Sequence, residues 1–305
     1  MWKIKKAFFA KIHREGFTWK DSIVITFLLV VIIFLLGSGI ALIIGNVFKS
    51  FGNGENAEFF NVIGDNFGFL GYWIICLIYL FIVKSDKPML RALGSEPKGN
   101  TVKMLLWGFP IGLVLNSLCA GVAILHGDIL LSFASFPVIK ILIVFVSVFV
   151  QSSGEEINCR FFLYQRLRKA YKSPWVAILV NPLVFVAVHM AIPGCTIWAI
   201  ISIYLVALMF SLMVYYFDSL WMAMAAHAAW NFTQNFIFGL PNSGTVYNFS
   251  IFKLDQATAK DSLFYNVLFG VEASITAVIV FAVACAVILL MMKKKPQKSL
   301  DVWQS

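Results

Sequence analysis

Charged residues are scarce in this sequence. They make up 13% of its 305 residues, whereas hydrophobic residues make up 60%. Soluble globular domains carry about 25% charged residues, so the composition excludes that class of protein. Nine Trp, nine Tyr and thirty Phe are typical of chains whose aromatic rings lie at bilayer interfaces and between membrane helices. The sequence therefore predicts an integral membrane protein.

Cysteine pairs are also lacking. The five Cys residues lie in or beside apolar segments without a short paired spacing, which excludes a disulfide framework and a zinc ribbon. The zinc-protease pattern His-Glu-x-x-His is absent as well. We find no internal repeat or low-complexity stretch, and we expect no removable signal peptide. Residues 1–305 are thus predicted to form a single integral membrane domain.

Long apolar segments dominate what is present. A membrane-crossing helix needs about 20 mainly apolar residues. Eight segments are predicted to cross: Ser22–Val47, Phe67–Val83, Met104–Leu125, Val138–Leu163, Trp175–Met190, Ile197–Phe217, Leu220–Phe238 and Val267–Met292. The predicted fold is all-α, a polytopic membrane protein with about eight transmembrane helices.

Positive charge is distributed unevenly between the two sides of these spans. With a cytoplasmic N-terminus, 20 of the 24 Lys and Arg residues fall in cytoplasmic segments. The positive-inside rule then places both termini in the cytoplasm. The net charge of +9 is therefore a topology signal, and we expect no nucleic-acid partner.

Few ionisable residues lie inside the predicted spans. Glu155 and Glu156 are the only adjacent acidic pair within an apolar helix, and His189 and His227 lie in two other spans. Such groups cost about 2.5–3.5 kcal/mol each on insertion scales and usually mark function. With Asn231, they fall roughly 14–24 Å from the cytoplasmic ends of their helices, which is the overlap in depth that a shared internal cavity requires.

Helical spacing separates the roles of the two carboxylates. Residues four apart share a helix face, so Glu156 is the one that can pair with Arg160. Glu155 is then left to face the cavity. The same four-residue spacing relates Phe185 to His189, and His227 to Asn231.

Three motifs thus stand in order along the chain: Glu155-Glu156-x-x-x-Arg160, Phe185-x-x-x-His189 and His227-x-x-x-Asn231. Together they resemble the signature of the CPBP family, also called the Abi or type II CAAX prenyl endopeptidase family of intramembrane proteases. The resemblance covers about residues 138–238, a motif-bearing core. It implies an eight-helix fold with a membrane-embedded cavity that is open to the cytoplasm.

The resemblance also implies a role for each motif residue. Glu155 would activate a water molecule with help from His189, and His227 and Asn231 would stabilise the oxyanion. Glu156 and Arg160 would be structural or substrate-positioning partners. Independently of the resemblance, we expect Phe185 to be a packing residue. Amide hydrolysis needs just such a base and such donors, so the residue types suit the chemistry.

A metal is the main chemical alternative. Glu155, His189 and His227 could bind zinc, and family members are often labelled metalloproteases. Because an Asn beside His227 suits an oxyanion donor better than a zinc ligand, we expect a metal-independent glutamate mechanism.

Other interpretations of the same residues remain open. Glu155 could lie in water at a helix end, His189 could be interfacial, and His227 and Asn231 could form an interhelical hydrogen-bonding stripe with Asn235. The chain could also be a non-catalytic membrane regulator or a proton-coupled transporter.

The leading hypothesis is an endopeptidase in a bacterial cell membrane that cleaves a membrane-associated protein or peptide. The resemblance links such enzymes to peptide maturation, bacteriocin self-immunity or regulation.

Overall fold

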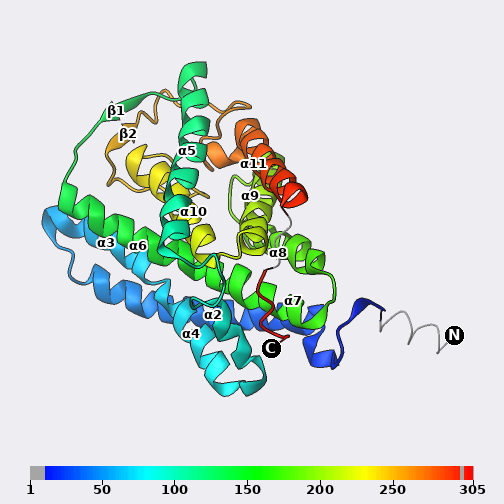
Figure 1. Ribbon diagram of the computed structural model, residues 1–305. Helices are drawn as coiled ribbons and strands as arrows, with labels where there is room; N and C mark the ends of the chain where they lie inside the picture. The colour runs from blue at the N-terminus through cyan, green and yellow to red at the C-terminus, as the bar shows by residue number, and fades with distance from the viewer. Residues whose placement is uncertain (1–10, 296–298, 305) are drawn as a thin grey trace.

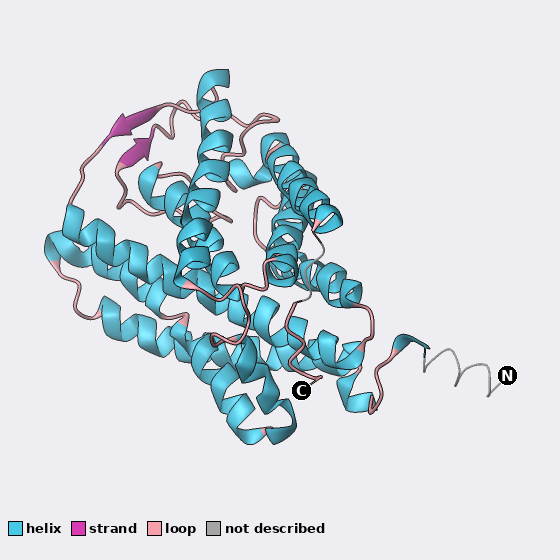
Figure 2. Cartoon of the chain, viewed as in Figure 1, coloured by secondary structure: helices cyan, strands magenta, loops and turns pink. Residues whose placement is uncertain are grey.

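The protein is almost entirely helical. A computed structural model describes residues 11–295 and 299–304, and Figure 2 shows that helices make up most of the described chain. The main helices are α2 (Ile23–Lys49), α3 (Ala57–Phe67), α4 (Leu70–Ile82), α5 (Val102–His126), α6 (Val138–Glu156), α7 (Tyr164–Ala170), α8 (Pro174–His189), α9 (Ile197–Tyr216), α10 (Leu220–Phe232) and α11 (Ile275–Lys294). This confirms the predicted all-α class of a polytopic membrane protein.

Within the described residues, six helical segments are long and apolar enough to cross a membrane: Ile23–Lys49, Gly54–Ile82, Val102–His126, Val138–Ala170, Ile197–Tyr216 and Ile275–Lys294. The other two predicted spans are helical but shorter. The fifth is α8, with 16 residues, and the seventh is α10, with 13, extended by the π-helical turn η5 (Thr233–Ile237). The ends of both helices agree with the predicted spans, Trp175–Met190 and Leu220–Phe238, to within one residue.

Two predicted boundaries were wrong. The second span begins earlier than Phe67, since α3 already turns Phe59, Val62 and Ile63 into the interior. The last helix begins later than Val267, because Ser274 caps it by accepting a bond from Ala277 N at 3.1 Å. The segment before it holds only the short 3₁₀ turn η6 (Val271–Ala273).

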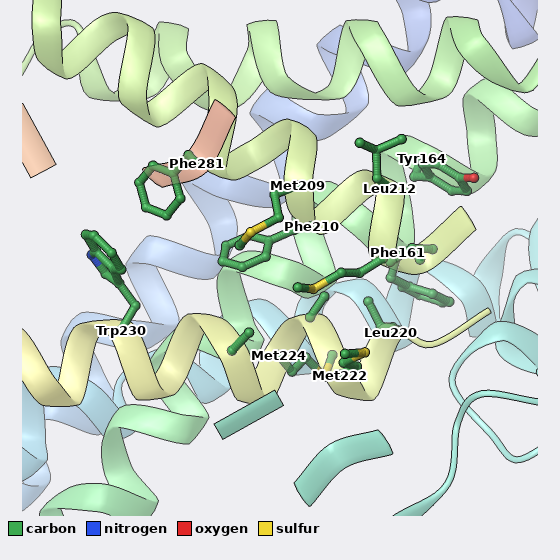
Figure 3. Close-up of a cluster of buried hydrophobic side chains, with 14 of the residues drawn as sticks. Phe161, Tyr164, Met209, Phe210, Leu212, Leu220, Met222, Met224, Trp230 and Phe281 are labelled. Carbon is green, nitrogen blue, oxygen red and sulfur yellow. The ribbon is translucent and has the colours of Figure 1, made fainter. Parts of the chain in front are cut away.

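Helix α10 is the central element of the bundle and packs against α5 and α6. A Cβ atom at Gly112 would collide with Ala226 O, so glycine allows α5 and α10 to approach closely. On another side of α10, large side chains fill the space toward α9 and α11 (Figure 3). Trp230 packs on Phe281 with ring centroids 4.7 Å apart. This packing fixes the rotation of α10 and hence the directions of its polar residues.

Both described ends of the chain meet at one end of the bundle, as Figure 1 shows. Arg14 forms an ion pair with Asp301 at 2.5 Å, and Arg168 at the end of α7 lies 3.3 Å from the same carboxylate. Strands β1 (Leu131–Phe133) and β2 (Phe252–Leu254) pair in antiparallel fashion at the opposite end. The described ends thus lie on the same side, in agreement with the charge distribution.

Candidate active site

The helix that carries the two glutamates does not end at them. After Glu156 it continues as the π-helical segment η4 (Ile157–Leu163) and then as α7. A π-helix is rare and is frequently found at functional sites, because it changes the direction of the side chains that follow. Glu155 therefore does not lie at an exposed helix end, and its side chain is 25% exposed.

Glu156 is fully buried and contacts both Arg160 and His227. Its Oε1 accepts a bond from Arg160 Nη1 at 2.9 Å, so the predicted ion pair is present. The same oxygen lies 2.8 Å from His227 Nδ1. A carboxylate can only accept, so Nδ1 carries the hydrogen and the imidazole ring is held in one orientation.

The Arg160 guanidinium is enclosed by aromatic rings. Its Cζ lies 4.6 Å from the ring centroid of Phe185 and 5.3 Å from that of Phe210. Its Nε and Nη2 have no hydrogen-bond partner among the described residues. Burying these donors without acceptors costs free energy. The attraction between the guanidinium and the ring faces offsets part of that free energy. Phe185 thus packs in the interior, as predicted.

Glu155 faces His227 from the other side. Its Oε2 lies 3.7 Å from His227 Nε2, while its Oε1 accepts a bond from Gln151 Nε2 at 2.6 Å. The imidazole of His227 therefore lies between two neighbouring carboxylates, each facing a different ring nitrogen. Its ring also stacks on Phe210 with centroids 5.3 Å apart.

Asn231 joins the same network through Gln151. Its Nδ2 donates to Gln151 Oε1 at 3.0 Å and to Ser152 Oγ at 3.2 Å. Its Oδ1 accepts a bond from Asn242 Nδ2 at 3.0 Å. His227 and Asn231 thus make hydrogen bonds between helices, whereas Asn235 binds the carbonyl oxygens of Leu240 and Thr245.

His189 lies at the end of α8 and is half-buried. Its Nδ1 is 2.8 Å from Phe185 O, so this nitrogen donates to the carbonyl and Nε2 is left to exchange a proton. Its ring centroid lies 4.5 Å from that of Phe185. Phe185 therefore contacts both the Arg160 guanidinium and the His189 imidazole.

These side chains line one cavity of about 780 Å³. Its wall includes Glu155, His189, His227 and Asn231, together with apolar residues of α2 and α8 such as Phe34 and Val188. The four residues proposed from the sequence as catalytic are thus brought to a single space.

Residues 136–233 match the family model described as type II CAAX prenyl endopeptidase Rce1-like. This match supports membership of the CPBP family for the segment that carries the motifs. No curated protein and no solved structure matches the chain. The matched residues include all three motifs, from Glu155 to Asn231.

The CPBP motifs do not account for every polar side chain of the cavity. Gln151, Asn242 and Glu272 also line it. Gln151 could have been found from the sequence, because it precedes Glu155 by four residues on an apolar helix. Glu272 is the one acidic residue of the last predicted span, and an ionisable residue in such a position usually marks function. Asn242 follows Pro241 in what reads as an ordinary turn, and nothing in the sequence links it to Asn231.

A zinc ion in this CPBP site would need several converging ligands. Among residues 11–295 and 299–304, no three His, Cys, Asp or Glu side chains are grouped so that they could hold a metal ion. Glu155 and His227 do approach each other, but His189 does not complete a set of three with them.

Proposed function

We propose that this protein is an intramembrane endopeptidase that hydrolyses a peptide bond in a membrane-associated protein or peptide. The observation that carries the proposal is the convergence of Glu155, His227 and Asn231, with His189, on one cavity inside a CPBP-type helical bundle. A carboxylate inside a bilayer is costly, and its presence in the same cavity as two imidazoles indicates a use.

Glu155 is the proposed general base. Its Oε1 is held by Gln151, which leaves Oε2 as the oxygen that can accept a proton from water. Oε2 and His227 Nε2 are 3.7 Å apart, close enough for one water oxygen to contact both. His189, whose Nε2 can take up a proton, would assist in activating that water.

His227 and Asn231 are the proposed oxyanion donors. Glu156 holds His227 through Nδ1, so Nε2 faces the reacting group, and it donates to the oxyanion when the ring carries both protons as an imidazolium. Both hydrogens of the Asn231 amide are engaged by Gln151 and Ser152. The substrate oxyanion would have to replace one of these bonds, and it would gain from a donor that is already oriented.

The test compares purified wild type with Glu155→Gln on a panel of prenylated and unprenylated peptides. Glu55→Gln is the matched control, because Glu55 is exposed and lies outside the cavity. We expect Glu155→Gln to lower kcat at least ~100-fold, since a positioned base contributes about that much or more. Cleavage by Glu155→Gln at the wild-type rate would refute the proposal, and binding without cleavage by wild type would favour a non-catalytic partner.

A further inference from the structure

The loop after η5 folds back into the bundle as a tight turn. Asn242 N donates to Thr245 O at 3.0 Å, and Thr245 N donates to Asn242 O at 2.9 Å. The two central residues, Ser243 and Gly244, have φ angles of +45° and +78°. Positive φ at both central positions is the type I′ geometry, which glycine adopts freely and serine does not.

Glu272 stabilises Ser243 in this unfavourable backbone conformation. Its Oε1 accepts bonds from Ser243 N at 2.5 Å and from Ser243 Oγ at 2.6 Å. The glutamate is 8% exposed, and its own backbone oxygen accepts a bond from Ser202 on α9. A strained residue persists when its surroundings hold it, so the turn depends on Glu272 for its conformation.

The turn directs Asn242 at Asn231. Gln234 Nε2 also binds Pro241 O at 2.5 Å, so the loop is anchored on both sides of the contact. Asn242 is 9% exposed, and its Nδ2 donates to Asn231 Oδ1 at 3.0 Å.

Three hydrogen bonds connect Asn242 to Glu155 in series, and in each of them the residue nearer Asn242 is the donor. Asn242 donates to Asn231, Asn231 donates to Gln151, and Gln151 donates to Glu155. An ionised carboxylate can only accept, so each amide has one orientation that satisfies its neighbours. With Asn242 at its far end, the Asn231 amide keeps its N–H groups on the side of α6 and of the cavity.

We propose that Asn242 is a positioning residue for the Asn231 amide, and that Glu272 holds it in place through the Ser243 turn. Asn242 and Glu272 lie outside the segment that matches the family model. The inference rests on the proposed function, in which Asn231 binds the oxyanion. Glu272 thereby couples the start of α11 to the reaction without touching the substrate.

A double-mutant cycle between Asn242 and Asn231 tests this role. We expect Asn242→Ala to lower kcat about 10-fold with KM changed less than about twofold, because a poorly oriented donor weakens transition-state binding more than substrate binding. In an Asn231→Ala background, Asn242→Ala should lower kcat no further. Glu272→Ala should reproduce the kcat loss of Asn242→Ala.

Two controls separate positioning from folding. Asn248→Ala changes an exposed residue of the same loop and should keep the wild-type kcat. Asn242→Asp keeps the size of the side chain but loses its N–H donors, so it should lose kcat as the alanine variant does. An equal loss of kcat from Asn242→Ala in both backgrounds, or no loss in wild type, would overturn the inference.

Its failure can be told from failure of the proposed function. If Glu155→Gln abolishes cleavage while Asn242→Ala matches wild type, only the positioning role is wrong. If no peptide is cleaved, Tm is measured instead for the two single variants and the double variant. The hydrogen bond between Asn231 and Asn242 predicts that the Tm loss of the double variant differs from the sum of the two single losses. Additive Tm losses would then overturn the inference.

Discussion

His227 Nδ1 lies 2.8 Å from Glu156 Oε1 in the interior of the bundle. The sequence assigned Glu156 to Arg160 alone, yet one oxygen of this carboxylate serves both partners. The ion pair is therefore part of the candidate site, because it fixes the ring whose other nitrogen faces Glu155.

Removing the Arg160 guanidinium should destabilise the fold strongly. Arg160→Met leaves Glu156 buried without its cation, and breaking a buried pair by removing one partner costs about 3–5 kcal/mol. Arg91→Met is the matched control, since its pair with Glu96 is partly exposed and is worth about 0–1 kcal/mol. Thermal unfolding in detergent measures the Tm of both variants, and equal decreases in Tm for Arg160→Met and Arg91→Met would contradict the prediction.

Phe185→Leu should weaken the packing between Arg160 and His189. The ring lies 4.6 Å from the guanidinium and 4.5 Å from the His189 ring centroid. We expect a loss of about 0.5–2 kcal/mol from the cation–ring contact, with a decrease in kcat because His189 is less constrained. Phe81→Leu is the control, since Phe81 is exposed on α4. A wild-type Tm and kcat for Phe185→Leu would show that the ring positions neither group.

Acid should remove the stabilisation supplied by Asp86. Burial by itself raises the pKa of Asp86, but the bonds from Lys169 and Tyr79 and the charge of Arg166 outweigh it and lower the pKa. The native state then favours the ionised form. This stabilisation is present above the unfolded-state pKa of about 4 and is lost as pH falls through the native pKa.

The Tm of Asp86→Asn should therefore lie well below that of wild type at pH 7, and the difference should shrink toward pH 3. Asp255→Asn, at an exposed loop residue, should match wild type throughout. A difference between wild type and Asp86→Asn that stays constant with pH would exclude ionised Asp86 as its source.

Chelation should leave cleavage unchanged. No group of three ligands suited to a metal is present in the described part of the chain, and the proposed base is held by Gln151. The measurement is kcat before and after treatment with a strong zinc chelator. Loss of activity that added zinc restores would instead assign Glu155, His189 and His227 as metal ligands.

Much of the fold could be predicted from local properties. Apolar length and the arrangement of Lys and Arg predict a polytopic helical protein, and the structure brings both described ends to one side. The number and bounds of the spans were less predictable. The late start of α11 depends on Ser274, which caps the helix, and on the turn that follows Gly270, and hydropathy reports neither.

By itself, the sequence determined the residue types, their spacing on each helix and the pairing of Glu156 with Arg160, because neighbours one turn apart share a face of any helix. Only the tertiary structure decided that His227 stands between Glu155 and Glu156, and that Asn242 and Glu272 reach the same cavity. Those contacts join positions far apart in the sequence, such as Glu156 and His227, which are separated by 71 residues. They depend on the rotation and register of packed helices, which no single segment specifies.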